Sequence, residues 1–236
     1  MVATFTHVVL GEPLTEAGAA FWSQALGGTW RAAASGWHRA ASLVPADGDA
    51  YVHRARPGHP APALVLEVDD VDAVARQARD LGAADGEVLR SPGGLAFRLK
   101  PAEPGRRRAP AARWSDGTTS RLVQLCLDCP PAAAEREAKF WAALTGWAWQ
   151  DSDSPEFVCH LVPGEGSLQL LVQRRASATP DEVTLHLDLG TSDREAEAAR
   201  LVALGATRVA TGGGWIVLRD PDGRTFCATG QPPEAP

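Results

Sequence analysis

The sequence predicts an α+β protein in which one type of domain is built twice along the chain. An alternating strand followed by an amphipathic helix occurs at the start, in TFTHVVLGEP and AGAAFWSQALGGTW, and returns from residue 121 in RLVQLCLDCPP and AAAEREAKFWAALTGWAW. Each helix carries Phe-Trp and ends at a glycine, and a Trp follows three residues after that glycine. Self-similarity at this range indicates a repeated unit, and each copy is expected to bury its own core.

Hydrophobic periodicity predicts the elements of the first copy in order. Alternation gives a strand at 4–10, and Pro13 opens a helix that ends at Leu26, before Gly27. Asp70 is expected to cap a second helix over 71–81. The remaining strands are predicted at 29–34, 37–44, 50–54, 63–68, 87–89 and 95–99. The last part is short enough for one strand to be missing.

The composition then changes to Pro, Ala, Gly and Arg, which predicts a linker over 105–119 in which Arg106-Arg107-Arg108 is a solvated run. The second copy repeats the first, with helices at 131–144 and 193–204. Its strands are predicted at 122–128, 147–150, 157–162, 168–173, 183–189, 208–210, 215–219 and 225–228. The domains are therefore expected at 1–104 and 120–231, followed by a disordered tail at 232–236.

Each half reads as a βαβββ unit repeated twice, so helices should cover the outer face of each curved mixed sheet while the inner face closes around a cavity. The net charge of −6 argues against a nucleic-acid partner. The sequence shows neither a signal peptide nor a membrane span, which predicts a cytoplasmic protein with no membrane partner. Eight Trp residues suit aromatic-lined clefts, so a small organic ligand is the expected partner, and the chain is expected to be a monomer or a homodimer.

Four segments of the chain, FWAALTGW, LQLLVQRR, LHLDLGTSDREAEAARLVALGA and WIVLRDPDGRTFCATG, resemble the vicinal oxygen chelate superfamily. This superfamily includes glyoxalase I, extradiol dioxygenases and bleomycin-resistance-type binding proteins. The chain is most similar to tandem glyoxalase-like proteins of the actinobacterial type. The resemblance implies two glyoxalase-like domains, of which the first is partly degenerate. It is specific for the fold and leaves the activity open.

The resemblance also implies where a metal would be held, because metal enzymes of this family place ligands on the first and last strands of paired units. These positions fall on His7, His53, Val65 and Ala96 in the first half and on Gln124, Gln173, His186 and Thr225 in the second. Neither set has the usual two imidazoles and one carboxylate, so no complete metal site is expected, and a divalent metal stays open as a cofactor with an incomplete motif. His7 and His53 remain as partial metal candidates, with His53 expected to be exposed. Glu67 and Asp188 would serve as ligands only with a shifted register.

The cavity face of the second half is predicted to bind a polar or aromatic organic molecule. The expected ligand-binding residues are Gln124, Gln169, Gln173, His186, Asp188, Trp215, Arg219 and Thr225. His186 is the candidate acid or base, with Asp188 on the same face of the strand. Residues two positions apart on a strand, such as His186 and Asp188, are separated by roughly 7 Å along it, which is too far for an assured hydrogen bond between their side chains.

Two functions are therefore carried forward from the sequence. The first is a metal-independent protein that binds a small molecule, of the resistance or sequestration type. The second is a divergent lyase, isomerase or dioxygenase that uses an atypical metal or metal-free catalysis by His186. Loss of the usual ligands favours the first function, and the retained histidines favour the second.

Overall fold

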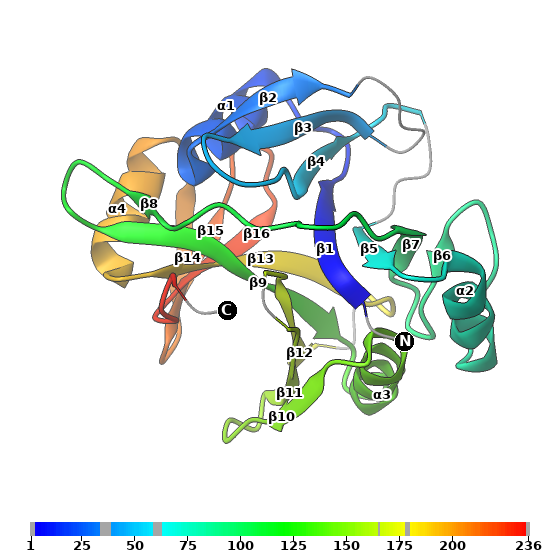
Figure 1. The fold of residues 1–236 in the computed structure, drawn as a ribbon. Helices are drawn as coiled ribbons and strands as arrows, with labels where there is room; N and C mark the ends of the chain where they lie inside the picture. Colours follow the sequence, from blue (N-terminus) through cyan, green and yellow to red (C-terminus); the bar gives the residue numbers. More distant parts are fainter. Residues whose placement is uncertain (1–2, 34–38, 59–62, 165, 178–179, 235–236) are drawn as a thin grey trace.

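The computed structural model describes residues 3–33, 39–58, 63–164, 166–177 and 180–234, which form two mixed sheets with four helices (Figure 1). The first half comprises β1 (Ala3–Leu10), α1 (Glu16–Leu26), β2 (Gly28–Ala32), β3 (Arg39–Pro45), β4 (Val52–Ala55), β5 (Leu64–Val68), α2 (Val71–Asp80), β6 (Leu89–Arg90) and β7 (Ala96–Pro101). The second half comprises β8 (Ala112–Arg113), β9 (Thr119–Cys129), α3 (Ala134–Thr145), β10 (Ala148–Asp151), β11 (Phe157–Val162), β12 (Gln169–Arg174), β13 (Thr184–Thr191), α4 (Arg194–Ala203), β14 (Thr207–Thr211), β15 (Trp215–Arg219) and β16 (Thr225–Thr229).

Each half forms one sheet in which the first strands of its two units pair antiparallel at the centre. The strand order is β2-β3-β4-β1-β5-β7-β6 in the first sheet and β10-β11-β12-β9-β13-β16-β15-β14 in the second, with β8 paired to β9. The predicted α+β architecture of tandem cupped sheets is confirmed. Where the second half has β14, the described part of the first half keeps only an isolated bridge between Ala84 and Arg90, so the expectation of a missing strand is also confirmed.

Side-chain caps decide where three of the helices begin. α1 begins at Glu16 rather than at the predicted Pro13, because the Thr15 hydroxyl accepts a hydrogen bond from the Gly18 amide at 3.1 Å. Asp70 and Asp193 cap α2 and α4 in the same way. α1 ends where Gly27 takes the left-handed conformation with φ 65°, which a residue with a Cβ rarely adopts.

The first helix of each half packs on the other half. Trp22 of α1 lies edge-on to Phe226 of β16 and donates a hydrogen bond to Asp220 at 2.8 Å. Trp141 of α3 lies edge-on to Phe97 of β7. Figure 1 shows α1 beside α4 and α3 near α2. The buried side chains form one continuous core through both halves, so the expectation that each copy buries its own core is wrong.

Each of these helix contacts includes one carboxylate. At α1 the carboxylate belongs to the opposite half, and at α3 it belongs to the helix itself. On α1, Gly18 leaves room for Asp222 of the β15–β16 turn, whose carboxylate would overlap a Cβ at that position. On α3 the carboxylate belongs to the helix: Glu137 accepts hydrogen bonds from the Gly93 amide of the β6–β7 turn and from Trp141. The two contacts are related by sequence duplication, and each pairs one glycine with one acid.

Three sequence predictions fall partly outside the described residues. The predicted strand 29–34 loses position 34, and the predicted strand 37–44 loses positions 37–38. The predicted tail 232–236 loses positions 235–236. Within the described ranges, no helix has the length and apolar character needed to cross a membrane.

Candidate functional site

The cup of the second half is built from side chains on one face of β9, β12, β13 and β16. In the pairing of β9 with β13, Cys126 lies opposite His186 and Gln124 lies opposite Asp188. Cys227 of β16 lies beside Asp188 in turn. Because alternate residues of a strand share a face, this register gathers imidazole, carboxylate, thiol and amide groups in one cup.

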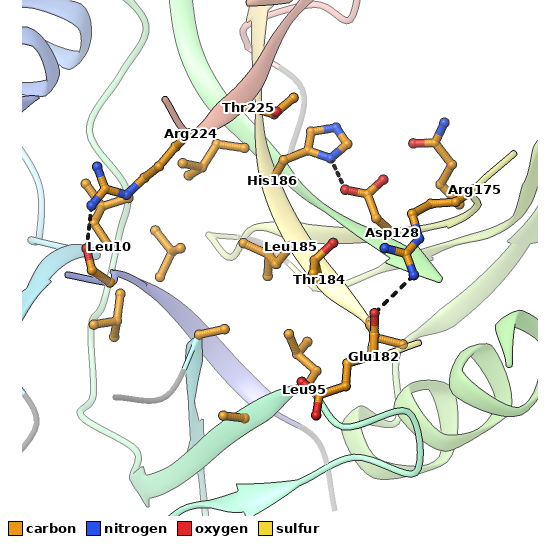
Figure 2. Close-up of a pocket in the computed structure, with 18 of the residues that line it drawn as sticks. Leu10, Leu95, Asp128, Arg175, Glu182, Thr184, Leu185, His186, Arg224 and Thr225 are labelled. Carbon is orange, nitrogen blue, oxygen red and sulfur yellow. Dashed lines mark hydrogen bonds and ion pairs between the residues drawn. The ribbon is translucent and has the colours of Figure 1, made fainter. Parts of the chain in front are cut away.

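His186 lies between two carboxylates. Its Nδ1 is 2.6 Å from Oδ2 of Asp128, and its Nε2 is 3.2 Å from Oδ1 of Asp188 (Figure 2 shows the first contact). The separation along the strand does not keep the side chains of His186 and Asp188 apart: they form an ion pair, although no aligned hydrogen bond joins them. Asp128 was missed in the sequence, although its alternation with Gln124 and Cys126 in QLCLD indicates the same face.

Three neighbours act on the pKa of His186. Burial alone would lower this pKa, but the charges of Cys126 and Asp188 and the hydrogen bonds with Asp128 and Asp188 outweigh burial and raise it well above its ordinary value of 6.5. Burial raises the pKa of the Cys126 thiol to about 12, so at physiological pH the negative charge beside His186 comes from the two carboxylates.

We expect His186 to be an imidazolium in metal-free protein at pH 7.5, with protons on both ring nitrogens. Imidazole ¹⁵N chemical shifts recorded from pH 5 to pH 10 measure this directly. Asp128→Asn should lower the pKa of His186, because it removes one of the two negative charges. Titration of wild-type His186 at or below pH 6.5 would contradict the expectation.

The side-chain amides of Gln124, Gln169 and Gln231 form a hydrogen-bond network that ends on Asp188. Gln124 donates a hydrogen bond to Oδ2 of Asp188, while its own carbonyl oxygen accepts from Gln169 at 2.6 Å and from Gln231 at 2.9 Å. Oδ1 of Asp188 is buried, and no described residue donates an aligned hydrogen bond to it; its contact with His186 is an ion pair. A buried carboxylate oxygen without a donor is uncommon in a folded protein.

A cavity of about 500 Å³ opens beside Asp188. One wall carries Phe157 and Trp215, whose ring centroids lie 5.6 Å apart in an edge-on arrangement. The predicted site residues that line this cavity are Gln124, Gln173, His186, Asp188 and Trp215. Gln169 joins them through the amide network. Thr225 lines a second cavity, between the halves, and Arg219 is exposed at the far end of β15 outside both linings.

The corresponding place in the first half is filled by the chain itself. Nε2 of His53 lies 2.9 Å from Nδ1 of His7, whose Nε2 lies 2.8 Å from Oε1 of Glu67. His53 is 1% exposed, so the prediction of an exposed His53 is wrong. Glu67 lies opposite Phe5 in the register, and its side chain reaches His7 on the same face of the sheet. The three side chains form a chain of contacts, His53 to His7 to Glu67, and do not converge on one point. Lys100 and Arg106 also bind Oε1 of Glu67, at 2.9 and 3.1 Å.

These contacts hold Glu67 ionised. Burial alone would raise its pKa, but hydrogen bonds from His7, the Glu103 amide and Lys100 outweigh burial and lower it to about 2. Burial lowers the pKa of His7 despite its bond to Glu67, so His7 is neutral and donates from Nε2.

The linker between the halves contributes to this packing. The Arg106 guanidinium lies 5.8 Å from the centre of the Phe5 ring, and the buried Arg108 donates to the carbonyl of Leu122 at 3.1 Å. Only Arg107 is well exposed among the three arginines. The predicted solvated run is therefore wrong for Arg106 and Arg108, because each has buried partners that sequence spacing does not reveal.

The registers of the two sheets make Glu67 and Asp188 equivalent. His7 lies opposite Val65 in the first sheet, as Cys126 lies opposite His186 in the second, and Glu67 and Asp188 each follow two residues later. The carboxylate is thus common to both halves, while the imidazoles lie on β1 and β4 in the first half and on β13 and β11, the latter from His160, in the second. In the first half, the cationic side chains of Lys100 and Arg106 bind this carboxylate.

The second half contains a group of atoms that fits a divalent metal ion. Nε2 of His186, a carboxylate oxygen of Asp188 and Sγ of Cys227 all lie within 4.8 Å of one another. Asp128 accepts at Nδ1 of His186, which is the arrangement that directs the other ring nitrogen toward a metal. Oδ1 of Asp188 supports the fit, since it is buried and no described residue donates an aligned hydrogen bond to it. One imidazole, one carboxylate and one thiol suit zinc better than manganese or magnesium.

Comparisons with known proteins agree with this architecture. Residues 124–229 match the family model described as a glyoxalase-like domain. No curated protein sequence matches the chain.

Among solved structures, similarity extends over nearly the whole chain. The Mn(II)-bound glyoxalase from Novosphingobium aromaticivorans is 18% identical, with a TM-score of 0.65 over 99% of this chain and 83% of that one. The 2,2',3-trihydroxybiphenyl 1,2-dioxygenase from Sphingomonas wittichii strain RW1 is 15% identical, with a TM-score of 0.59 over 97% and 89%. The homoprotocatechuate 2,3-dioxygenase from Arthrobacter globiformis is 13% identical, with a TM-score of 0.51 over 97% and 79%. Identities this low support the shared fold alone.

Proposed function

We propose that this chain, whose residues 124–229 form a glyoxalase-like domain within a vicinal oxygen chelate fold, binds a small organic molecule in the cup of its second half. The proposal is carried by Oδ1 of Asp188, which is buried and ion-paired with His186 but has no aligned hydrogen-bond donor among the described residues. In the first half, Lys100 and Arg106 satisfy the equivalent Glu67. In the second half the cup is open, so a ligand supplies the missing donor.

The lining defines what such a ligand offers. An O–H or N–H group pairs with Asp188, and a planar group packs against Trp215 and Phe157. A volume of about 500 Å³ suits a small organic molecule, since ligand pockets typically measure roughly 300–1,000 Å³. A protein that only sequesters its ligand needs no further chemistry.

Binding is tested with chelator-treated protein, screened against neutral aromatic compounds by Trp fluorescence. For any compound that binds, Asp188→Asn should weaken the affinity at least about tenfold, because a hydrogen bond to a charged group contributes about 1.5–3 kcal/mol. Gln173→Ala should weaken it as well, since Gln173 lines the cavity. Arg219→Ala is the matched control and should leave affinity unchanged. Full affinity in Asp188→Asn would remove the basis of the proposal.

A second candidate function is a metal-dependent lyase, isomerase or dioxygenase reaction in the same cup. The observation that favours it is the convergence of His186, Asp188 and Cys227, with Asp128 orienting the imidazole. A divalent ion held there would polarise an oxygen of the bound substrate. Asp128 and Gln124 would serve to orient the two ligands they contact.

Metal analysis of protein purified without a histidine tag, before and after chelator, separates the two functions. Near-stoichiometric zinc that is lost in Cys227→Ser and Asp188→Asn supports the metal-dependent reaction. Lys100→Met in the first half is the control and should leave the metal content unchanged. Metal-free protein that binds an aromatic compound supports the sequestering function.

A further inference from the structure

A second cavity, of about 750 Å³, lies where the two halves meet. Figure 2 looks into it: Leu10 and Leu95 of the first half lie across the cavity from Thr184 and Leu185 of the second. Neither half forms this cavity alone. Apart from Arg90, its wall near the first half is apolar and includes Val8, Val9, Leu10, Ala63, Leu95 and Ala96, whereas the side from the second half also carries the charged residues Asp128, Arg175, Glu182 and Arg224.

The two cavities meet at His186. Both linings include Gln173, His186, Trp215 and Cys227. Seen from His186, one side leads to Asp188 and the amides of Gln124 and Gln231, and the other leads to the leucines at the interface. Both linings mix polar and apolar groups, and the valines and leucines of the first half add an apolar wall on the far side of His186.

From this arrangement we propose that the two cavities hold a single elongated ligand. Its head is planar and neutral and donates an N–H or O–H to Asp188, and its apolar tail passes His186 into the cavity between the halves. The inference rests on the function proposed above for the second-half cup and adds the shape of the ligand. It also gives the first half a role, because Leu10, Leu95 and Ala96 provide the wall against which the tail packs.

Apolar burial sets the expected dependence on tail length. Each methylene removed from water contributes about 0.8 kcal/mol, which corresponds to roughly fourfold in affinity. A tail confined to the second-half cup would meet Phe157, Leu171 and Trp215 there, so a length dependence reports on the second cavity only if filling that cavity removes it. Binding of the head reports on the second-half cup.

The test uses the full chain and 4-alkylbenzamides from benzamide to 4-hexylbenzamide, with affinity measured by Trp fluorescence and by calorimetry. The amide head can donate to Asp188 and its ring can pack on Trp215. For the wild type, affinity should rise roughly fourfold per methylene. Asp188→Asn should weaken the whole series by at least about tenfold.

Two variants fill the second cavity from opposite sides. Thr225→Phe does so from the exposed end of β16, and Ala96→Phe from β7 of the first half. Both should remove the gain from added methylenes while leaving the affinity for benzamide unchanged. Thr207→Phe, on the exposed strand β14 outside both linings, is the matched control and should keep the full length dependence.

The outcomes separate this inference from the function on which it rests. Benzamide binding that depends on Asp188 but shows no length dependence, or a length dependence that survives both Phe variants, overturns the elongated ligand and leaves the second-half site in place. If no member of the series binds, or if all bind equally to Asp188→Asn, both proposals are overturned for this class of ligand.

Discussion

Trp141→Ala should destabilise the whole protein by about 3–5 kcal/mol. Trp141 is fully buried on α3, and its ring packs edge-on against Phe97 of the other half at 5.1 Å. Its removal leaves a large cavity in a core that runs through both halves. It also takes away the Nε1 donor of the buried Glu137, which then keeps fewer hydrogen bonds.

Denaturant unfolding followed by far-UV circular dichroism measures this loss. The transition should stay single and shift as a whole, because Trp141 belongs to the contact between the halves. Trp149→Ala is the control: Trp149 is 38% exposed on β10, and its replacement should change the free energy of unfolding by no more than about 0.5 kcal/mol. A Trp141→Ala protein that loses less than about 1 kcal/mol, or in which one half unfolds separately, would contradict a shared core.

Acidification should cost the protein about 3 kcal/mol through Glu67 alone. Its pKa falls from 4.5 to about 2 on folding, so between these values the unfolded chain binds more protons than the folded one. The stabilisation is therefore complete above pH 4.5, and it is lost as the pH falls through about 2. Each pKa unit corresponds to about 1.4 kcal/mol, which gives the expected size.

Unfolding free energies of the wild type and Glu67→Gln at pH 5 and pH 2.5 test this. Glu67→Gln is expected to be less stable at pH 5, because it leaves Lys100 and Arg106 without their buried carboxylate, and to lose less stability on acidification. Asp69→Asn, at an exposed position directly after β5, is the control and should follow the wild type. Equal pH dependence of wild type and Glu67→Gln would show that the first-half cluster does not hold an ionised carboxylate.

The sequence alone determined the fold, because the information for it is local and repeated. Alternation predicted the strands, helix periodicity and Gly27 or Gly146 predicted the helices, and the repeat of Phe-Trp predicted two copies of one unit. The identity of the cup face followed from the same alternation, which is why Gln124, His186 and Asp188 were already candidates.

The tertiary structure decided what those side chains meet. Strand register placed Asp128 and Asp188 on either side of His186, and it brought Glu67 to His7. Neither is visible in sequence, since pairing between distant strands depends on the whole sheet. Arg106 is the clearest case: its sequence surroundings indicate solvent, but a buried carboxylate 39 positions away holds it in the first-half cup. In the second half, Arg194 lines the cup but donates to the carbonyl of Gly213, and the cup keeps a cavity of about 500 Å³.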